Sequence, residues 1–283
     1  MNFIDRLLRK VDFYSGRTNF PYLSGDTFSS LCDVTINSLP INELDWSELK
    51  RANSVFIKSD SFFDFVKLLP SLTNLKVIVV GNGDTNFGEL VIPKSPGIQF
   101  FCQNYSGSYS GNINLLPLGL ENLKLAGSGQ EKYFRSSGSA RIFHKVLVPP
   151  HGNTNEARDE AIRKLHGNNL FEVMDGRLSR RAYFRKTHRY KFVLCLEGNG
   201  FDTHRIWETL YQNNFPVVLK TGWSKNLESL GLPILIVDNL DLLDSEILQK
   251  HAYENRHYRA KETGILWGPH WQSLFAELEK GNL

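Results

Sequence analysis

The chain has 283 residues, 41% of them hydrophobic and 22% charged, which is enough apolar content for one large core or two small ones. This composition excludes a disordered or collagen-like chain. The net charge of +3 is too small to indicate nucleic-acid binding, and no apolar run approaches the ~18 residues that a membrane span needs.

The three cysteines, Cys32, Cys102 and Cys195, lie far apart in apolar surroundings and form no CxxC motif. We expect buried thiols in a reducing compartment, which predicts a cytoplasmic protein. Residues 1–10 mix charged and apolar side chains and lack a cleavage site, so they are not expected to be a signal peptide. They predict a short amphipathic helix that packs on its own domain, with a membrane surface as the alternative.

The first half of the chain alternates apolar runs with polar turns. Continuous apolar runs are typical of buried strands in a parallel sheet. We expect such strands at residues 54–57, 75–80, 97–102 and 114–117, and a helix over 61–69. The run at 75–80 (LKVIVV) is expected to be a central strand.

The second half repeats this pattern, with expected strands at 145–148, 192–196, 215–219 and 233–237. Helices are expected over 156–165, with Asn155 as the N-cap, and over 203–212. The Gly- and Ser-rich segment 126–140 is the best candidate for a linker.

The alternation of strands and helices predicts an α/β protein with two Rossmann-like domains that face each other across a cleft. We expect an N-terminal domain over 1–130 and a C-terminal domain over 141–265. A last helix is expected within 266–283, where it could cross back to the first domain. Ligands of such sheets bind beyond the carboxyl ends of the strands, so every turn that follows a strand is a candidate site.

The sharpest local signal lies in residues 191–220, where a strand leads into a glycine-containing loop and a helix. Gly198 and Gly200 allow close approach of the backbone or a positive φ, and Asp202 or Thr203 can cap the helix. A helix N-terminus attracts phosphate, and Arg205, which follows His204, can grip a diphosphate with its planar guanidinium. Glu208 can accept hydrogen bonds from a ribose; the alternative is an exposed salt bridge between Arg205 and Glu208.

This segment resembles the exostosin-like glycosyltransferases. Their pattern is a buried strand, Gly, a short polar loop, Arg, two residues, Glu, and then a strand with Pro-Val. It reads here as Gly198, Asn199 to His204, Arg205, Glu208 and Pro216-Val217-Val218. The segment is also similar to the FEN…DYVTEK region of fucosyltransferases through Glu197, Asn199, Asp202 and Glu208. The resemblance implies a GT-B fold, a sugar nucleotide bound by the C-terminal domain, and no requirement for a metal.

The turns of the first half follow the order found in small exostosin-like bacterial transferases, though only the C-terminal motif is specific. The chain departs from the family pattern at Glu197, where an Arg often precedes the Gly. A carboxylate there can bind a sugar hydroxyl or take part in catalysis.

Glycosyl transfer with inversion requires a base that removes the proton of the acceptor hydroxyl. Asp84 is the first candidate because it follows the expected central strand, and Asp26 is the second. Each of them has the alternative role of an ordinary turn-forming or helix-capping aspartate.

Four further residues are candidates for substrate binding. Asn153, Thr154 and Arg158 belong to a loop and the first turn of a helix after an expected strand, where related transferases bind the donor. Asn104 could hold the acceptor or the donor phosphate. A plain N-capped helix with a solvent-exposed Arg158, and a turn-forming Asn104, are the alternatives.

Seven basic residues lie between 177 and 191 without an acidic residue among them. They predict a solvated face, with an anionic membrane surface or a phosphate-bearing lipid as alternative partners. The aromatic residues among them, Tyr183, Phe184 and Tyr190, are expected to pack the helix onto its sheet. No DxD or HxxxH motif is present, so we expect no metal site and no cofactor besides the donor itself.

These observations predict a metal-independent glycosyltransferase that moves a sugar from a nucleotide-sugar donor to a glycan or lipid-linked acceptor, in surface polysaccharide synthesis. One alternative is a catalytically inactive protein that binds a glycan or a nucleotide on the same fold. Another is a different enzyme that uses a two-domain cleft, such as a nucleotide-sugar epimerase. No nucleic-acid partner is expected.

Overall fold

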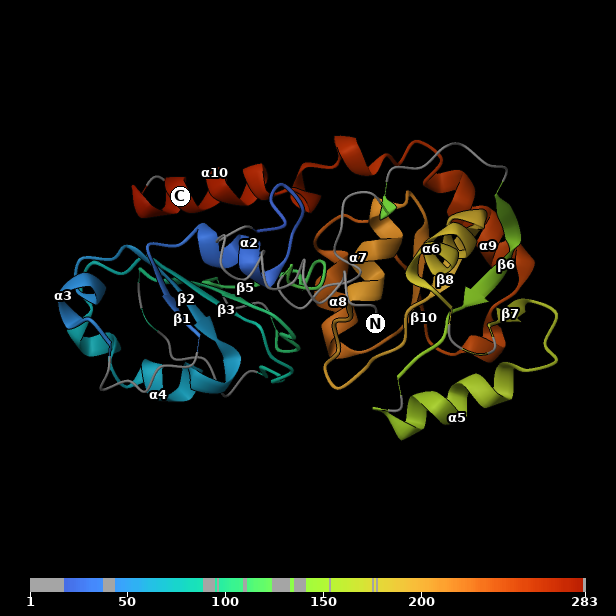
Figure 1. The fold of residues 1–283 in the computed structure, drawn as a ribbon, viewed down its shortest axis with the longest axis horizontal. Helices are drawn as coiled ribbons and strands as arrows, with labels where there is room; N and C mark the ends of the chain where they lie inside the picture. Colours follow the sequence, from blue (N-terminus) through green and yellow to red (C-terminus); the bar gives the residue numbers. More distant parts are fainter. Residues whose placement is uncertain are drawn as a thin grey trace.

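The computed structural model describes residues 18–37, 44–88, 95, 97–108, 111–123, 133–134, 141–152, 154–174, 176 and 178–281. Within these ranges the chain forms two five-stranded sheets, and all paired strands of both sheets run parallel (Figure 1). The prediction of an α/β protein with two parallel sheets is therefore confirmed.

The first sheet has its strands in the order in which they occur along the chain. They are β1 (Val34–Ile36), β2 (Ser54–Lys58), β3 (Val77–Gly81), β4 (Gln99–Cys102) and β5 (Ile113–Leu115). The strand at LKVIVV is β3, and its predicted central position is confirmed. The sequence did not predict β1, because three residues at the edge of a sheet are too few to form a recognisable apolar run.

Both faces of this sheet are covered, because successive side chains of a strand point to opposite faces. Val77 and Val79 of β3 pack under α2 (Gly25–Ser30) and α10 (Gly268–Glu279). Ile78 and Val80 pack on the other face, where α3 (Trp46–Leu49) and α4 (Phe62–Val66) lie. Short 3₁₀ turns, Ser59–Ser61 and Leu69–Ser71, flank α4. The last helix of the chain thus completes the core of the first sheet, as Figure 1 shows.

The second sheet has the order β10-β9-β8-β6-β7. Its strands are β6 (Ile142–Val148), β7 (Phe171–Val173), β8 (Tyr190–Leu194), β9 (Phe215–Leu219) and β10 (Leu235–Val237). The chain leaves β6 toward β7 and then returns past β6 to continue through β8 in the other direction. This is the doubly wound order 2-1-3-4-5, whose direction reverses between β6 and β8. The sequence did not predict the three-residue strand β7.

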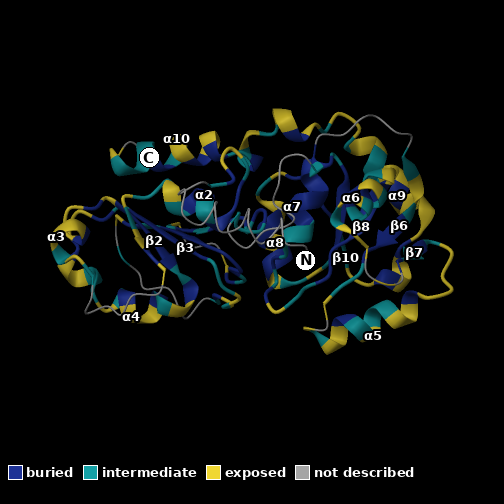
Figure 2. Cartoon of the chain, viewed as in Figure 1, coloured by how far each residue is buried: buried dark blue, intermediate teal, exposed yellow. Residues whose placement is uncertain are grey.

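Helices cover both faces of the second sheet. Phe192 and Leu194 of β8 share a core with α5 (Glu156–Leu165) and α9 (Ser245–Glu254), whereas Val193 faces α6 (Arg180–Arg189) and α7 (His204–Tyr211). The predicted bounds of α5 are confirmed, and Asn155 is its N-cap. The remaining elements are α8 (Gly222–Glu228) and the 3₁₀ turns Leu240–Leu242, Ala260–Glu262 and Gly264–Leu266. Figure 2 shows the strands β2, β3 and β8 buried and the outer faces of α5 and α9 exposed.

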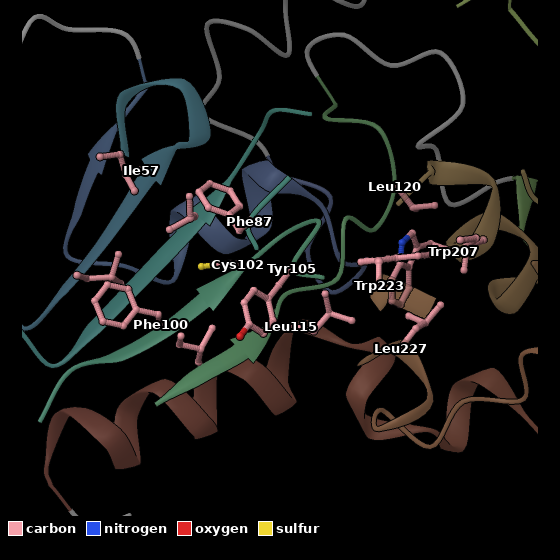
Figure 3. Close-up of a cluster of buried hydrophobic side chains, with 14 of the residues drawn as sticks. Ile57, Phe87, Phe100, Cys102, Tyr105, Leu115, Leu120, Trp207, Trp223 and Leu227 are labelled. Atoms are coloured by element: carbon pink, nitrogen blue, oxygen red, sulfur yellow. The ribbon is translucent and has the colours of Figure 1, made fainter. Parts of the chain in front are cut away.

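One apolar cluster contains residues of both sheets. In Figure 3, Leu115 belongs to β5 of the first sheet and Tyr105 follows β4, while Trp207 and Trp223 belong to α7 and α8 on the other side of the contact. Polar contacts reinforce it: the Asn226 side-chain amide donates to the Tyr105 and Gly107 carbonyls, both at 2.9 Å. Most of the predicted linker 126–140 lies outside the described residues. Within it, Phe134 is buried against α6 and α7.

Candidate functional site

The point at which the second sheet reverses direction is bordered by the loops that follow β6 and β8. In open parallel sheets this is where ligands bind. Two side chains tie the loops together: Asn155 Nδ2 donates to the Gly198 carbonyl at 3.0 Å, and Arg158 Nη1 donates to the Glu197 carbonyl at 3.1 Å. The amide oxygen of Asn155 also accepts from the backbone N–H of Arg158, so the N-cap of α5 is part of the same link. The loops are therefore held in a fixed relation to each other.

Arg158 is buried behind the glycine loop, with 8% of its surface exposed. Its Nη2 donates to Thr154 Oγ1 at 2.9 Å and to the Gly152 carbonyl, whereas its buried Nε has no partner among the described residues. Burial and the neighbouring Arg205 lower the pKa of the guanidinium. The expected solvent-exposed alternative for Arg158 is thus wrong, while Asn153 lies outside the described residues.

Arg205 lies on the other side of the same loop. Its Nη2 donates to the Pro150 carbonyl at 2.7 Å and its Nε to the hydroxyl of Tyr183 at 3.4 Å. That hydroxyl donates in turn to Glu208 Oε2 at 3.3 Å, and Glu208 is only 8% exposed. The alternative of an exposed helix pair is therefore wrong. The three side chains form a chain that holds the Arg205 guanidinium beside the loop after β6.

His151 lies close enough to both arginines for their charges to act on its ring. Both of its ring nitrogens are buried and have no hydrogen-bond partner of good geometry among the described residues. Burial, followed by the charges of Arg205 and Arg158, lowers the pKa of His151 to about 2, so its ring is neutral at pH 7. The side chains of Arg158, Arg205 and His151 thus lie at the switch point of the second sheet, and the two arginines are cations.

A cavity of about 590 Å³ lies between the loops of the two sheets and is lined by both. The second sheet contributes the loop after β8 and the start of α7. The first sheet contributes residues that follow its strands. The polar lining comprises Asn37, Lys58, Asn82, Asp84, Glu121 and Asn122 from the first half, and Asn199, Asp202, Thr203 and His204 from the second, together with Gly25, Gly83, Gly198 and Gly200.

The three carboxylates that we predicted to be catalytic lie in different places. Asp84 lines the cavity. Asp26 lies in the first turn of α2, where its Oδ2 accepts from the Leu123 N–H at 3.0 Å, and it is not part of the lining. Glu197 lines a separate cavity of about 140 Å³ behind the glycine loop, and burial raises the pKa of its carboxyl group. The structure therefore brings only Asp84 to the shared cavity.

The start of α7 also faces this cavity. Thr203 is its N-cap but makes no side-chain cap bond, and its buried Oγ1 has no partner among the described residues. Thr203 and His204 both line the cavity. The helix N-terminus therefore presents uncapped backbone N–H groups to the space between the sheets.

Asp202 and Asn104 join the two halves of the chain. Asp202 is 4% exposed; its Oδ2 accepts from the Leu118 N–H at 2.9 Å and its Oδ1 from Trp207 Nε1 at 2.8 Å. Asn104, 2% exposed and at φ 54°, donates to the Gly83 carbonyl at 3.2 Å. Because these polar atoms are engaged within the chain, the two residues position the site's loops. The predicted capping of α7 by the Asp202 side chain is wrong.

The two glycines of the loop differ in how much space surrounds them. Neither has a positive φ. A Cβ on Gly200 would lie 2.9 Å from Asn104 Nδ2, which is closer than real side chains come. A Cβ on Gly198 would make only ordinary contact with Arg158 Nη1 at 3.5 Å, so the structure leaves room for a small side chain there.

The basic stretch 177–191 does not form one solvated face. Phe184 of α6 is buried in the same cluster as Val193 of β8, which confirms that this aromatic residue packs the helix onto its sheet, whereas Tyr190 begins β8 itself. Lys191 is buried as well, and its Nζ donates to the Asn213 carbonyl at 2.6 Å. In the part of the chain that the structure describes, every helix is too short or too polar to cross a membrane. Within the same residues, no group of three or more His, Cys, Asp or Glu side chains is placed to hold a metal ion.

Sequence reasoning missed His151, Tyr183, Lys58 and Glu121 as parts of the site. Lys58 directly follows an expected strand, and His151 and Glu121 come shortly after expected strands. Their position in the chain was therefore a usable signal. Tyr183 lies in the middle of α6 and carried no such signal. No protein-family model and no curated protein sequence matches this chain. Its function must therefore be inferred from the geometry of the site.

Proposed function

We propose that the protein is a glycosyltransferase that moves a sugar from a nucleotide-activated donor to a glycan or lipid-linked acceptor. The observation that carries this proposal is the position of Arg158, Arg205 and the uncapped N-terminus of α7. The two arginines contact the loops that follow β6 and β8 at the switch point of a parallel sheet, and the start of α7 lines a 590 Å³ cavity that a second parallel sheet also lines. A diphosphate is the ligand that suits paired guanidinium groups and helix N–H groups.

In this proposal the second half binds the donor. The diphosphate approaches the Gly198 to Gly200 loop and the first turn of α7, where Arg158 and Arg205 offset its charge. Glu208 and Tyr183 keep the Arg205 side chain in place. A further cavity of about 330 Å³, lined by Pro149, Pro150, His151, Val173 and Met174, adjoins the switch point and has room for the nucleoside.

The first half binds the acceptor. Its contribution to the cavity is rich in groups that hydrogen-bond sugar hydroxyls, among them Lys58, Asn82, Glu121 and Asn122. Several lining side chains offer an atom that can take the acceptor proton, among them Asp84, Glu121 and His204. We propose that the two halves form a compact GT-B arrangement of the exostosin-like type, which serves surface polysaccharide synthesis.

Catalysis then depends on two effects. The cavity aligns an acceptor hydroxyl with the anomeric carbon of the donor, and the basic groups stabilise the diphosphate as it leaves. Both effects require only that donor and acceptor loops keep their relative positions, and the links through Asn104, Asp202 and Asn226 provide this.

The test is calorimetric titration of the wild-type protein with UDP, GDP and their common sugar conjugates. Arg205→Ala is expected to weaken the affinity for the preferred nucleoside diphosphate by about 30- to 150-fold, since a charge-assisted contact contributes about 2–3 kcal/mol. Arg158→Ala should have an effect of similar size. Arg163→Ala, on the exposed side of α5, is the control and should leave the affinity unchanged.

Failure of the wild-type protein to bind any nucleotide of the panel would refute the donor site. Unchanged affinity in folded Arg205→Ala and Arg158→Ala proteins would refute the assignment of the two arginines. Nucleotide binding without sugar transfer to any acceptor would point to a binding protein on the same fold.

A further inference from the structure

His204 is the first residue of α7, and its imidazole turns away from the donor loops toward the first half of the chain. Its Nδ1 lies 2.9 Å from the carbonyl oxygen of Gly119, 85 positions earlier. Consecutive helical residues point about 100° apart. Arg205, the next residue, therefore reaches Pro150 in the second half, while His204 contacts the first.

This contact determines which ring nitrogen carries the proton. A carbonyl oxygen only accepts hydrogen bonds, so Nδ1 must be the protonated nitrogen of the neutral ring. The lone pair is then on Nε2. That nitrogen has no hydrogen-bond partner among the described residues and belongs to a side chain that lines the 590 Å³ cavity. A neutral histidine held in this tautomer is ready to accept a proton from a bound hydroxyl group.

The carbonyl that holds the ring is itself held firmly. Gly119 has φ +70°, and a Cβ at this position would lie 2.3 Å from the Leu23 carbonyl oxygen, so only glycine fits. The flanking residues are bonded on both sides: Leu118 N–H donates to Asp202 at 2.9 Å, and Leu120 N–H donates to the Leu23 carbonyl at 2.7 Å. The segment around Gly119 is therefore a rigid anchor for the imidazole.

Charged groups of both halves surround His204. Burial lowers the pKa of its imidazole, while the Gly119 carbonyl and the charges of Glu121 and Asp84 act in the opposite direction. Lys58, from the end of β2, and Asp202, two residues before His204, also line the cavity. The ring is thus neutral near pH 7, and nearby carboxylates stabilise the imidazolium once it forms.

We propose that His204 is the general base of the transfer reaction, a role that rests on the function proposed above. Nε2 removes the proton of the acceptor hydroxyl as its oxygen forms a bond to the anomeric carbon. The bond from that carbon to the diphosphate oxygen breaks, and its electron pair leaves with the nucleoside diphosphate. The imidazolium then returns its proton to water. Attack opposite the leaving group inverts the anomeric configuration.

In this assignment Asp84 faces the imidazolium and stabilises it. From the sequence, Asp84 is the first candidate for the base because it follows the central strand. The structure adds what the sequence lacked, which is an imidazole on the opposite wall, fixed in one tautomer with its acceptor nitrogen available.

The first experiment needs no substrate. ¹⁵N-resolved NMR of the free wild-type protein at pH 7.5 reports the tautomer of each histidine, and a His204→Asn variant assigns the signal. We expect the Nδ1–H form for His204. The Nε2–H form, or a ring still protonated at this pH, would refute the inference.

The second experiment measures turnover of UDP-glucose, UDP-N-acetylglucosamine and GDP-mannose, with water and simple aryl glycosides as acceptors. His204→Asn keeps an N–H donor for Gly119 but lacks Nε2. We expect kcat to fall by about 10²- to 10⁴-fold, as is usual for the loss of a general base. The affinity for the donor should change by less than about threefold, because the variant leaves Arg158 and Arg205 in place. The rise of kcat/KM with pH should disappear, and added imidazole should restore part of the rate.

The outcomes separate this inference from the proposed function. If no donor binds or reacts in the wild-type protein, the proposed function fails. If the wild-type protein transfers sugar and His204→Asn retains its kcat and its pH profile, only the role of His204 fails. Loss of donor affinity with unchanged pH dependence would show that His204 binds phosphate instead. If the pH dependence disappears in Asp84→Asn but not in His204→Asn, Asp84 is the base and the inference is wrong.

Discussion

The side-chain oxygen of Asn104 accepts a hydrogen bond from the backbone N–H of Asp202 at 2.8 Å, although 98 positions separate the two residues. Asn104 follows β4 of the first sheet, and Asp202 lies between β8 and α7 of the second. This bond is buried, so it is protected from competition with water. It places the glycine loop of one half directly against the polar turns of the other.

Gly200→Ala should disrupt this contact. Its Cβ would lie 2.9 Å from Nδ2 and 3.0 Å from Oδ1 of Asn104, whose amide is bonded on both sides. We expect the free energy of unfolding to fall by about 1–3 kcal/mol in urea denaturation. Gly264→Ala is the matched control, because the nearest atom to its Cβ would be 3.8 Å away. Equal stability of the two variants would contradict the tight contact.

Asp202→Asn tests the other residue of this contact between the two halves. Both carboxylate oxygens of Asp202 accept from N–H groups, so one amide NH₂ would face a donor. The variant should lose about 1–3 kcal/mol of stability. The measurement is chemical denaturation of both proteins at the same pH.

The same pair of proteins should differ in pH dependence. Burial raises the pKa of Asp202 to about 7 from 3.8, against the hydrogen bonds from Leu118 and Trp207 that lower it. Between these values the folded state binds more protons than the unfolded state, so the contribution of Asp202 to stability is full below about pH 4 and is lost as the pH rises through 7. The stability difference between wild type and variant should therefore decrease steadily as the pH rises from about 4 to 7. Parallel pH profiles would show that Asp202 does not titrate there.

Phe275→Ala tests whether the last helix belongs to the core of the first sheet. Phe275 is 1% exposed, and its ring centroid lies 5.0 Å from that of Phe101 in β4. Removal of a buried phenylalanine ring typically costs about 3–5 kcal/mol. Gln272→Ala, on the exposed side of α10, should change the stability by less than about 0.5 kcal/mol. A small loss for Phe275→Ala would indicate that α10 is dispensable for this core.

Tyr183→Phe removes the hydroxyl that links Arg205 to Glu208. We expect a modest loss of stability, about 0.5–1.5 kcal/mol, and a loss of nucleoside diphosphate affinity smaller than that of Arg205→Ala. Tyr253→Phe is the control, since Tyr253 is 67% exposed. If both tyrosine variants bind nucleotide like the wild type, Tyr183 does not position Arg205.

The fold was predictable where local patterns were strong. Val77 to Val80 are four consecutive buried residues, and such a run in a chain of strands and helices indicates a central parallel strand. The N-cap residue Asn155 and the periodicity after it determined where α5 begins and ends. Strands β1 and β7 have three residues each, so their pairing depends on neighbouring strands that a local pattern does not contain.

By itself, the sequence determined the α/β class, the loops that follow the strands, and the polar residues that these loops contain. These features depend on interactions between near neighbours in the chain. The tertiary structure decided which of those residues meet. It brought Asp84 and His204 to one cavity, and placed Asp26 and Glu197 outside its lining. It also buried Glu208 beside Tyr183 and turned His204 toward Gly119. These contacts join residues 25 to 85 positions apart, and they follow from how two sheets and their helices pack, which no short stretch of sequence encodes.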